Sequence, residues 1–137
     1  MKLEELQVYQ LSMEIGEKIW NIVIKWNIFE KETIGKQLVK AVDSVAANFS
    51  EGFGRYHFNE AKHFRYYSRG SLFETKTWLT KAKNRTLIPA KDFNIFMKEI
   101  DIIGIKLNNY IKSIGTKSKK SRTIIDIETN DSGTIDN

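Results

Sequence analysis

One Glu-x-x-His motif, formed by Glu60 and His63, has residue types and spacing suited to metal binding. Helical bundles that hold two metal ions use this spacing on inward-facing positions, because residues three apart share one side of a helix. Such a site needs the motif twice and two further glutamates. This chain has one copy, and His57 is its only other histidine. We therefore expect no metal and no other cofactor.

A second set of polar residues could bring two carboxylates, Glu51 and Glu74, close together on antiparallel helices. A carboxylate pair could carry acid–base catalysis. The alternative is a structural layer in which polar side chains satisfy one another and fix the register of the helices. No nucleophile motif or Gly-rich phosphate loop accompanies the pair, so we expect no enzymatic activity. The predicted structural network contains Ser44, Asn48, Glu51, Arg55, Ser71 and Glu74.

A third candidate is one side of the helix predicted over residues 59–84. At about 100° per residue, apolar and small residues gather on one side. The other side interleaves basic and aromatic residues: Lys62, Arg65, Tyr66, Arg69, Phe73, Lys76 and Lys83. Such a side suits a phosphate backbone, with aromatic rings available to stack on bases. The alternative is a solvated lysine face with Tyr66 and Phe73 buried in a subunit contact.

Composition sets limits on these possibilities. A chain of 137 residues has room for one domain with a genuine core. The net charge of +5 permits an acidic partner such as RNA or DNA without requiring one. The absence of cysteine excludes disulfides and fits a reducing compartment. No apolar run is long enough for a membrane helix and no signal peptide is apparent, so we expect a cytoplasmic protein without membrane contact.

The elements that must position these residues are four long helices. Apolar residues recur at helical spacing over residues 4–26, 34–52, 59–84 and 89–114. The short connections predict an all-α, antiparallel up-down-up-down four-helix bundle. The bundle should occupy residues 1–115, followed by a charged, flexible C-terminal tail over residues 116–137.

Four residues mark the expected helix ends. Thr33 and Asn59 are suitable N-caps for the second and third helices. Pro89 suits the first position of the fourth helix, and Gly115 should end it.

The first helix carries an unusually broad apolar surface. One face should hold Leu6, Tyr9, Met13, Trp20 and Val23, and the surface is widened by Leu3, Ile15, Ile19, Ile22 and Trp26. A single small bundle rarely needs so wide an apolar arc. We therefore expect a subunit interface on this helix.

Two stretches resemble the signatures of one bacterial family: QLVKAVDSVAANFSEGFGR at residues 37–55 and FRYYSRGSLFETKTWL at residues 64–79. Its members are small four-helix-bundle proteins encoded in intervening sequences of large-subunit ribosomal RNA genes. The accessory variability protein of diversity-generating retroelements belongs to the same family. The resemblance implies a ring-shaped homopentamer with a basic surface. In the retroelement branch, that surface binds RNA or DNA and a reverse transcriptase.

Together, the residues and the resemblance predict a non-catalytic oligomeric scaffold that binds nucleic acid. The alternative is an orphan intervening-sequence protein with a structural or protein-interaction role and no nucleic-acid binding. An enzyme using Glu51 and Glu74 is a third hypothesis, kept for exclusion.

Overall fold

The structure is a computed structural model that describes the backbone of residues 1–129 and the side chains of residues 1–115. Every regular element in that part of the chain is helical. In order they are the 3-10 turn η1 (Leu3–Glu5), α1 (Gln7–Val23), α2 (Ile28–Glu30), the π-helical turn η2 (Lys31–Gly35), α3 (Lys36–Gly54), α4 (Phe58–Asn84) and α5 (Ala90–Thr129). The predicted all-α fold is confirmed.

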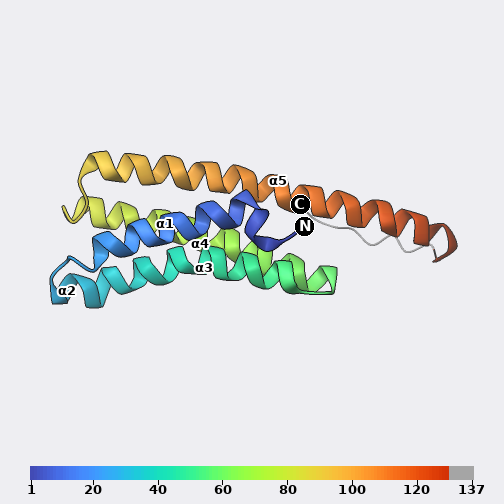
Figure 1. The fold of residues 1–137 in the computed structure, drawn as a ribbon, viewed down its shortest axis with the longest axis horizontal. Coiled ribbons are helices and arrows are strands. Elements are labelled where there is room, and N and C mark those ends of the chain that lie inside the picture. The colour runs from blue at the N-terminus through green and yellow to red at the C-terminus, as the bar shows by residue number, and fades with distance from the viewer. Residues whose placement is uncertain (130–137) are drawn as a thin grey trace.

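The long helices α1, α3, α4 and α5 form a bundle in which each helix packs against its neighbour in the chain (Figure 1). The bundle closes because α5 also packs against α1. The pairs α1–α3 and α4–α5 therefore form opposite sides of the bundle, joined by the α3–α4 and α1–α5 contacts. At its C-terminal end, helix α5 projects well beyond the other long helices.

The core follows from the spacing of inward-facing residues. On α4 these recur in steps of three and four, the repeat that keeps one face against neighbouring helices: Ala61, Arg65, Ser68, Leu72, Thr75, Leu79 and Ala82. Large side chains from the other helices are almost completely buried in the same core, among them Ile19, Phe49 and Leu107. Close packing along the full bundle fixes which side of α4 remains outside.

The beginning of the second helical rod differs from the prediction. The Asn27 side chain accepts a hydrogen bond from the Glu30 backbone N–H at 3.1 Å, so Asn27 is the N-cap. Helices α2, η2 and α3 then run without a break. Thr33 lies inside this rod, where its hydroxyl donates to the Phe29 carbonyl at 2.8 Å. The prediction that Thr33 caps the helix was wrong, because an equally good capping residue occurs earlier.

Three other helix boundaries also differ. Helix α4 begins at Phe58 after His57, so Asn59 lies in its first turn and is not the cap. Pro89 immediately precedes α5, and its carbonyl accepts the Phe93 N–H at 3.0 Å. Gly115 does not end α5, which continues to Thr129. Glycine weakens a helix by only about 1 kcal/mol relative to alanine, so it does not force an end.

The predicted tail, residues 116–137, carries a basic run followed by an acidic run. The backbone of residues 116–129 belongs to α5. The side chains of these residues, and residues 130–137 altogether, lie outside the described part of the structure. The flexibility of the tail stays a prediction.

The inward face of α1 is rotated relative to the prediction. Its buried residues are Val8, Ser12, Ile15, Gly16, Ile19 and Val23. Met13 and Trp20, which we placed on one apolar face with Val23, are 45% and 48% exposed. The apolar arc is wide enough that α1 buries only one part of it. The part of the arc that stays exposed is apolar, as a subunit interface would require, and the subunit interface stays a prediction.

Candidate nucleic-acid interface

Helix α4 is held tightly against α3 on one flank. Gly52 permits this approach, because a Cβ atom at that position would lie 3.0 Å from the Ala61 carbonyl oxygen and 3.2 Å from the Phe64 Cβ. Higher along the pair, the buried Ser68 hydroxyl donates to the Val45 carbonyl at 2.7 Å. These contacts fix the rotation of α4 about its axis and determine which residues it presents on its other flank.

The other flank of α4 carries cations that lie over aromatic rings. The Lys62 ammonium is 5.9 Å from the centroid of Tyr66. Arg69 and Lys76 lie 5.9 Å and 5.7 Å from the centroid of Phe73. Such contacts orient each cation without neutralising its charge. At the end of the helix, Lys83 lies 4.8 Å from the Phe93 ring of α5.

Arg65 does not belong to this surface, which corrects the sequence prediction. Its side chain is only 7% exposed and occupies an inward position of the α4 repeat. The guanidinium lies between the rings of Phe58 and Tyr110, at 5.8 Å and 5.7 Å from their centroids. Burial lowers the pKa of Arg65, and Tyr110 partly opposes that shift. Arg65 therefore has a structural environment.

The remaining cations differ in how far they are neutralised. Lys76 donates to Asp101 of α5 at 2.9 Å and forms an ion pair with it. None of the ion pairs among residues 1–115 involves Lys62, Arg69 or Lys83. These three charges remain available to a partner. We call Lys62, Arg69 and Lys83 the basic flank.

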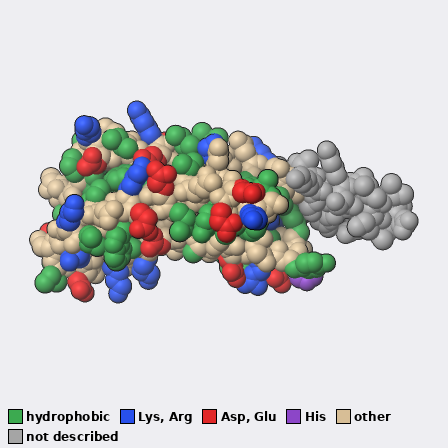
Figure 2. All heavy atoms as spheres, viewed as in Figure 1, with side chains coloured by type: hydrophobic (Ala, Val, Ile, Leu, Met, Phe, Trp, Pro, Cys, Tyr) green, Lys and Arg blue, Asp and Glu red, His purple; other side chains and the backbone are tan. Residues whose placement is uncertain are grey.

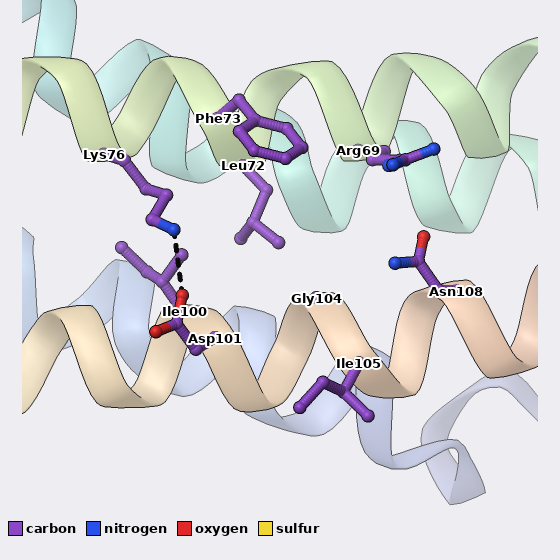
Figure 3. Close-up of a pocket in the computed structure, with 9 residues that line it drawn as sticks. All are labelled: Arg69, Leu72, Phe73, Lys76, Ile100, Asp101, Gly104, Ile105 and Asn108. Carbon is purple, nitrogen blue, oxygen red and sulfur yellow. Dashed lines mark hydrogen bonds and ion pairs between the residues drawn. The ribbon is translucent and has the colours of Figure 1, made fainter.

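A groove of about 360 Å³ lies between α4 and α5 beside the basic flank (Figure 3). Leu72 and Ile100 contribute apolar lining, and Phe73 stands at the rim with 56% of its surface exposed. Gly104 contributes no side chain to the α5 wall, and a Cβ atom at that position would lie 3.4 Å from Leu72 Cδ2. Asn108 reaches from α5 toward Arg69 at one end of the groove.

A second groove, of about 300 Å³, lies on the opposite side of the bundle between α1 and α3. Glu17 and Asp43 line it together with Tyr9 and Met13. Partial burial raises the pKa of the Asp43 carboxyl, and the charge of Glu17 raises it further. This groove is therefore acidic, and the sequence interpretation missed it.

The predicted polar network is divided into separate contacts. Asn48 donates to Ser71 across α3 and α4 at 3.4 Å. Arg55 pairs with Glu51 and lies 3.5 Å from Glu60, all on the surface. The other two members bond locally: Ser44 donates to the Lys40 carbonyl, and Glu74 accepts from the Trp78 indole.

Glu51 and Glu74 are not brought together as a catalytic pair. Asn48 faces Ser71, and each glutamate follows its partner by three residues on an antiparallel helix. The two positions therefore diverge along the bundle by roughly 9 Å, at about 1.5 Å per residue. The antiparallel register itself separates these carboxylates.

The Glu-x-x-His motif is split between other contacts. Glu60 lies by Arg55, and the His63 ring stacks near Tyr67 at 6.5 Å between centroids. Within the described side chains there is no cluster of three or more potential metal-binding residues.

No helix over the described residues combines the length and apolar character needed to cross a membrane.

Sequence reasoning also missed the α5 contribution to the α4–α5 groove. Asp101, Gly104 and Asn108 recur in steps of three and four, so they share one side of α5. A glycine in the middle of a helix, flanked at that spacing by polar residues, was the available signal. Such a pattern indicates a shallow depression on the helix surface, but the sequence does not show which helix faces it.

Comparison with known proteins identifies the family. The model of the 23S rRNA-intervening sequence protein family matches residues 4–109. This chain belongs to that family. A search of curated proteins found no match.

The fold also occurs in a crystal structure of a protein of unknown function from the S23 ribosomal protein family of Bacteroides thetaiotaomicron. The two are 19% identical, with a TM-score of 0.69 over 77% of this chain and 98% of the other. This likeness supports the bundle fold of this chain. It does not assign a function to any residue.

Proposed function

We propose that this family member is a non-catalytic, cytoplasmic scaffold that binds RNA or DNA through the basic flank of α4. The observation that carries the proposal is the arrangement of Lys62, Arg69 and Lys83. Each is held over or beside an aromatic ring and takes part in none of the ion pairs within residues 1–115. Cations placed in this way can meet phosphates while the rings meet bases or riboses.

RNA is the partner that the family description favours, because the family is named for intervening sequences of 23S rRNA. One basic flank supplies few phosphate contacts, so a single chain would bind weakly. An oligomer multiplies those contacts, and linked sites raise the affinity without new chemistry. We therefore include a homo-oligomer, a pentamer by the family resemblance, in the proposal.

The exposed apolar residues of α1 support a contact between copies. Met13 and Trp20 are each nearly half exposed. Light scattering coupled to size exclusion should give a mass several times the 15.9 kDa of one chain. A mass of one chain would contradict the oligomer while leaving the binding surface open to test.

A reverse transcriptase is a further candidate partner, suggested by the resemblance to the retroelement branch. Co-purification with a reverse transcriptase encoded beside this gene would support it. The alternative function is an interaction protein without nucleic-acid binding, which the exposed surface of α1 would equally suit.

The binding proposal is tested by fluorescence anisotropy with a structured RNA and a DNA duplex over a salt series. The test variant carries Lys62→Gln, Arg69→Gln and Lys83→Gln. The matched control removes the same number of charges elsewhere, with Lys25→Gln, Lys36→Gln and Lys40→Gln, all at exposed positions. Both should remain folded, since exposed charges contribute little to stability.

We expect wild type and control to bind with a steep salt dependence. The test variant should bind more weakly, with a logarithmic salt slope smaller by about 0.7–0.9 for each lost contact. Absence of wild-type binding at low salt, or equal binding by the two triple variants, would overturn the proposal.

A further inference from the structure

The α4–α5 groove has a shape that the basic flank alone does not explain. Its volume of about 360 Å³ lies within the range of about 300–1,000 Å³ that is usual for ligand pockets. Leu72 and Ile100 give it an apolar interior, and Gly104 leaves one position of the α5 wall without a side chain. A charged surface that touched phosphates only would not require such a hollow.

The two ends of the groove differ in net charge. Lys76 and Asp101 form an ion pair at one end and largely neutralise each other. At the other end, Arg69 takes part in none of the ion pairs of the described residues, and Asn108 points toward it in Figure 3. The positive charge of the groove is therefore concentrated at Arg69.

Phe73 provides a flat apolar surface at the rim. Just over half of its surface is exposed, although it is among the larger apolar side chains of α4. Arg69 and Lys76 lie near it from either side along the helix. An exposed ring held between cations is suited to stacking by a planar group that is attached to an anion.

We propose that the α4–α5 groove accepts one unpaired nucleobase, with the base against Phe73 and its phosphate at Arg69. The carboxamide of Asn108 can donate to or accept from the base edge. This inference rests on the proposed function and adds a substrate class to it, single-stranded nucleic acid. In a duplex, stacking and pairing keep the bases out of such a groove, whereas loops and single strands can present them.

The test fills the groove without changing a charge. Gly104→Leu places an apolar side chain in the hollow. The Cβ itself makes an ordinary 3.4 Å contact with Leu72. The matched control is Gly70→Leu, because Gly70 is an exposed helical glycine with no atom within 4 Å of its Cβ position. Binding of a single-stranded RNA and of a duplex of equal length is measured by anisotropy. Circular dichroism checks folding.

Wild type and Gly70→Leu should prefer the single strand. Gly104→Leu should lose about tenfold or more in single-strand affinity while duplex affinity and its salt slope stay the same. If Gly104→Leu does not fold, Phe73→Leu decides, since it keeps an apolar side chain and removes the ring. Its single-strand affinity should fall to a similar extent.

The inference is overturned if wild type shows no preference for single strands. It is also overturned if folded Gly104→Leu, or Phe73→Leu in its place, retains that preference. In both cases duplex binding through the basic flank can persist, so the proposed function stands. Loss of all wild-type binding would instead overturn the proposed function, and this inference with it.

Discussion

The two grooves on opposite sides of this bundle are similar in size and opposite in charge. The α4–α5 groove has about 360 Å³ and presents Arg69 beside an exposed ring. The α1–α3 groove has about 300 Å³ and presents Glu17 and Asp43. On the face shown in Figure 2, basic and acidic side chains are interspersed without an extended patch of one sign.

The difference shows that helix packing alone does not select a partner. Both grooves arise because neighbouring helices leave space between them where small residues occur. Charge then distinguishes them, since a polyanion is attracted to Arg69 and repelled by the Asp43–Glu17 pair. Partial burial raises the pKa of the Asp43 carboxyl, and the neighbouring negative charge of Glu17 adds to that shift.

The largest effect should follow from a substitution at Arg65, one turn from Arg69. Arg65→Glu would place a carboxylate at a position that is 7% exposed and enclosed by Phe58 and Tyr110. We expect a loss of about 3 kcal/mol or more in the free energy of unfolding.

Arg69→Glu is the matched substitution on the outside of α4 and should change stability by about 0.5 kcal/mol or less. Urea denaturation measures both variants. Similar stabilities for the two would show that Arg65 is not the buried member of the pair.

A second substitution tests the contact that joins the two sides of the bundle. Gly52→Val should destabilise the protein by about 1–3 kcal/mol, because its Cβ would lie only 3.0 Å from the Ala61 carbonyl oxygen. Gly54→Val is the control, since nothing lies within 4 Å of that position. Thermal melts compare them. Equal melting temperatures would mean that α3 and α4 do not approach so closely.

The smallest effect concerns the acidic groove. The folded-state pKa of Asp43 is raised, so its ionised form destabilises the folded state at pH values above that pKa. The penalty disappears as the pH falls below the unfolded-state value of 3.8. Asp43→Asn should therefore increase stability at pH 7 by only roughly a few tenths of a kcal/mol, because much of the side chain is exposed and screened.

Denaturation at pH 7 and at pH 3 checks this prediction. The gain should be present at the higher pH and absent at the lower. A gain of equal size at both values would show that the substitution acts through packing and not through charge.

The sequence predicted the bundle because its periodic apolar residues and short connections depend only on local spacing. It also predicted the aromatic and basic side of α4, except that Arg65 is buried and Tyr66 packs partly against the core. Arg65 is buried because α4 packs against both α3 and α5, which widens the buried face of α4. By helical angle, Arg65 lies near the edge of the basic side, so the wider buried face includes it. Likewise, the apolar surface predicted for α1 coincides only in part with its buried face, since a broad apolar arc does not specify which part is buried.

The grooves could not be predicted in the same way, because each requires residues from two helices in a known register. The Asn48–Ser71 contact was expected, yet the same register separates Glu51 from Glu74. Gly104 and Asn108 acquire a role only when α5 is placed beside Arg69 and Phe73. Pairwise placement of helices, and not local pattern, decides these sites.

Nucleic-acid binding by α4 is tested most directly by locating bound nucleic acid on the protein. Wild-type protein is irradiated with ultraviolet light in complex with single-stranded RNA, and adducts are mapped by mass spectrometry. Aromatic residues on both sides serve as reporters: Tyr66 and Phe73 on α4, and Tyr9 and Trp20 on α1. We expect adducts at Tyr66 or Phe73 that disappear at high salt. Adducts at Tyr9 or Trp20, with none on α4, would contradict it.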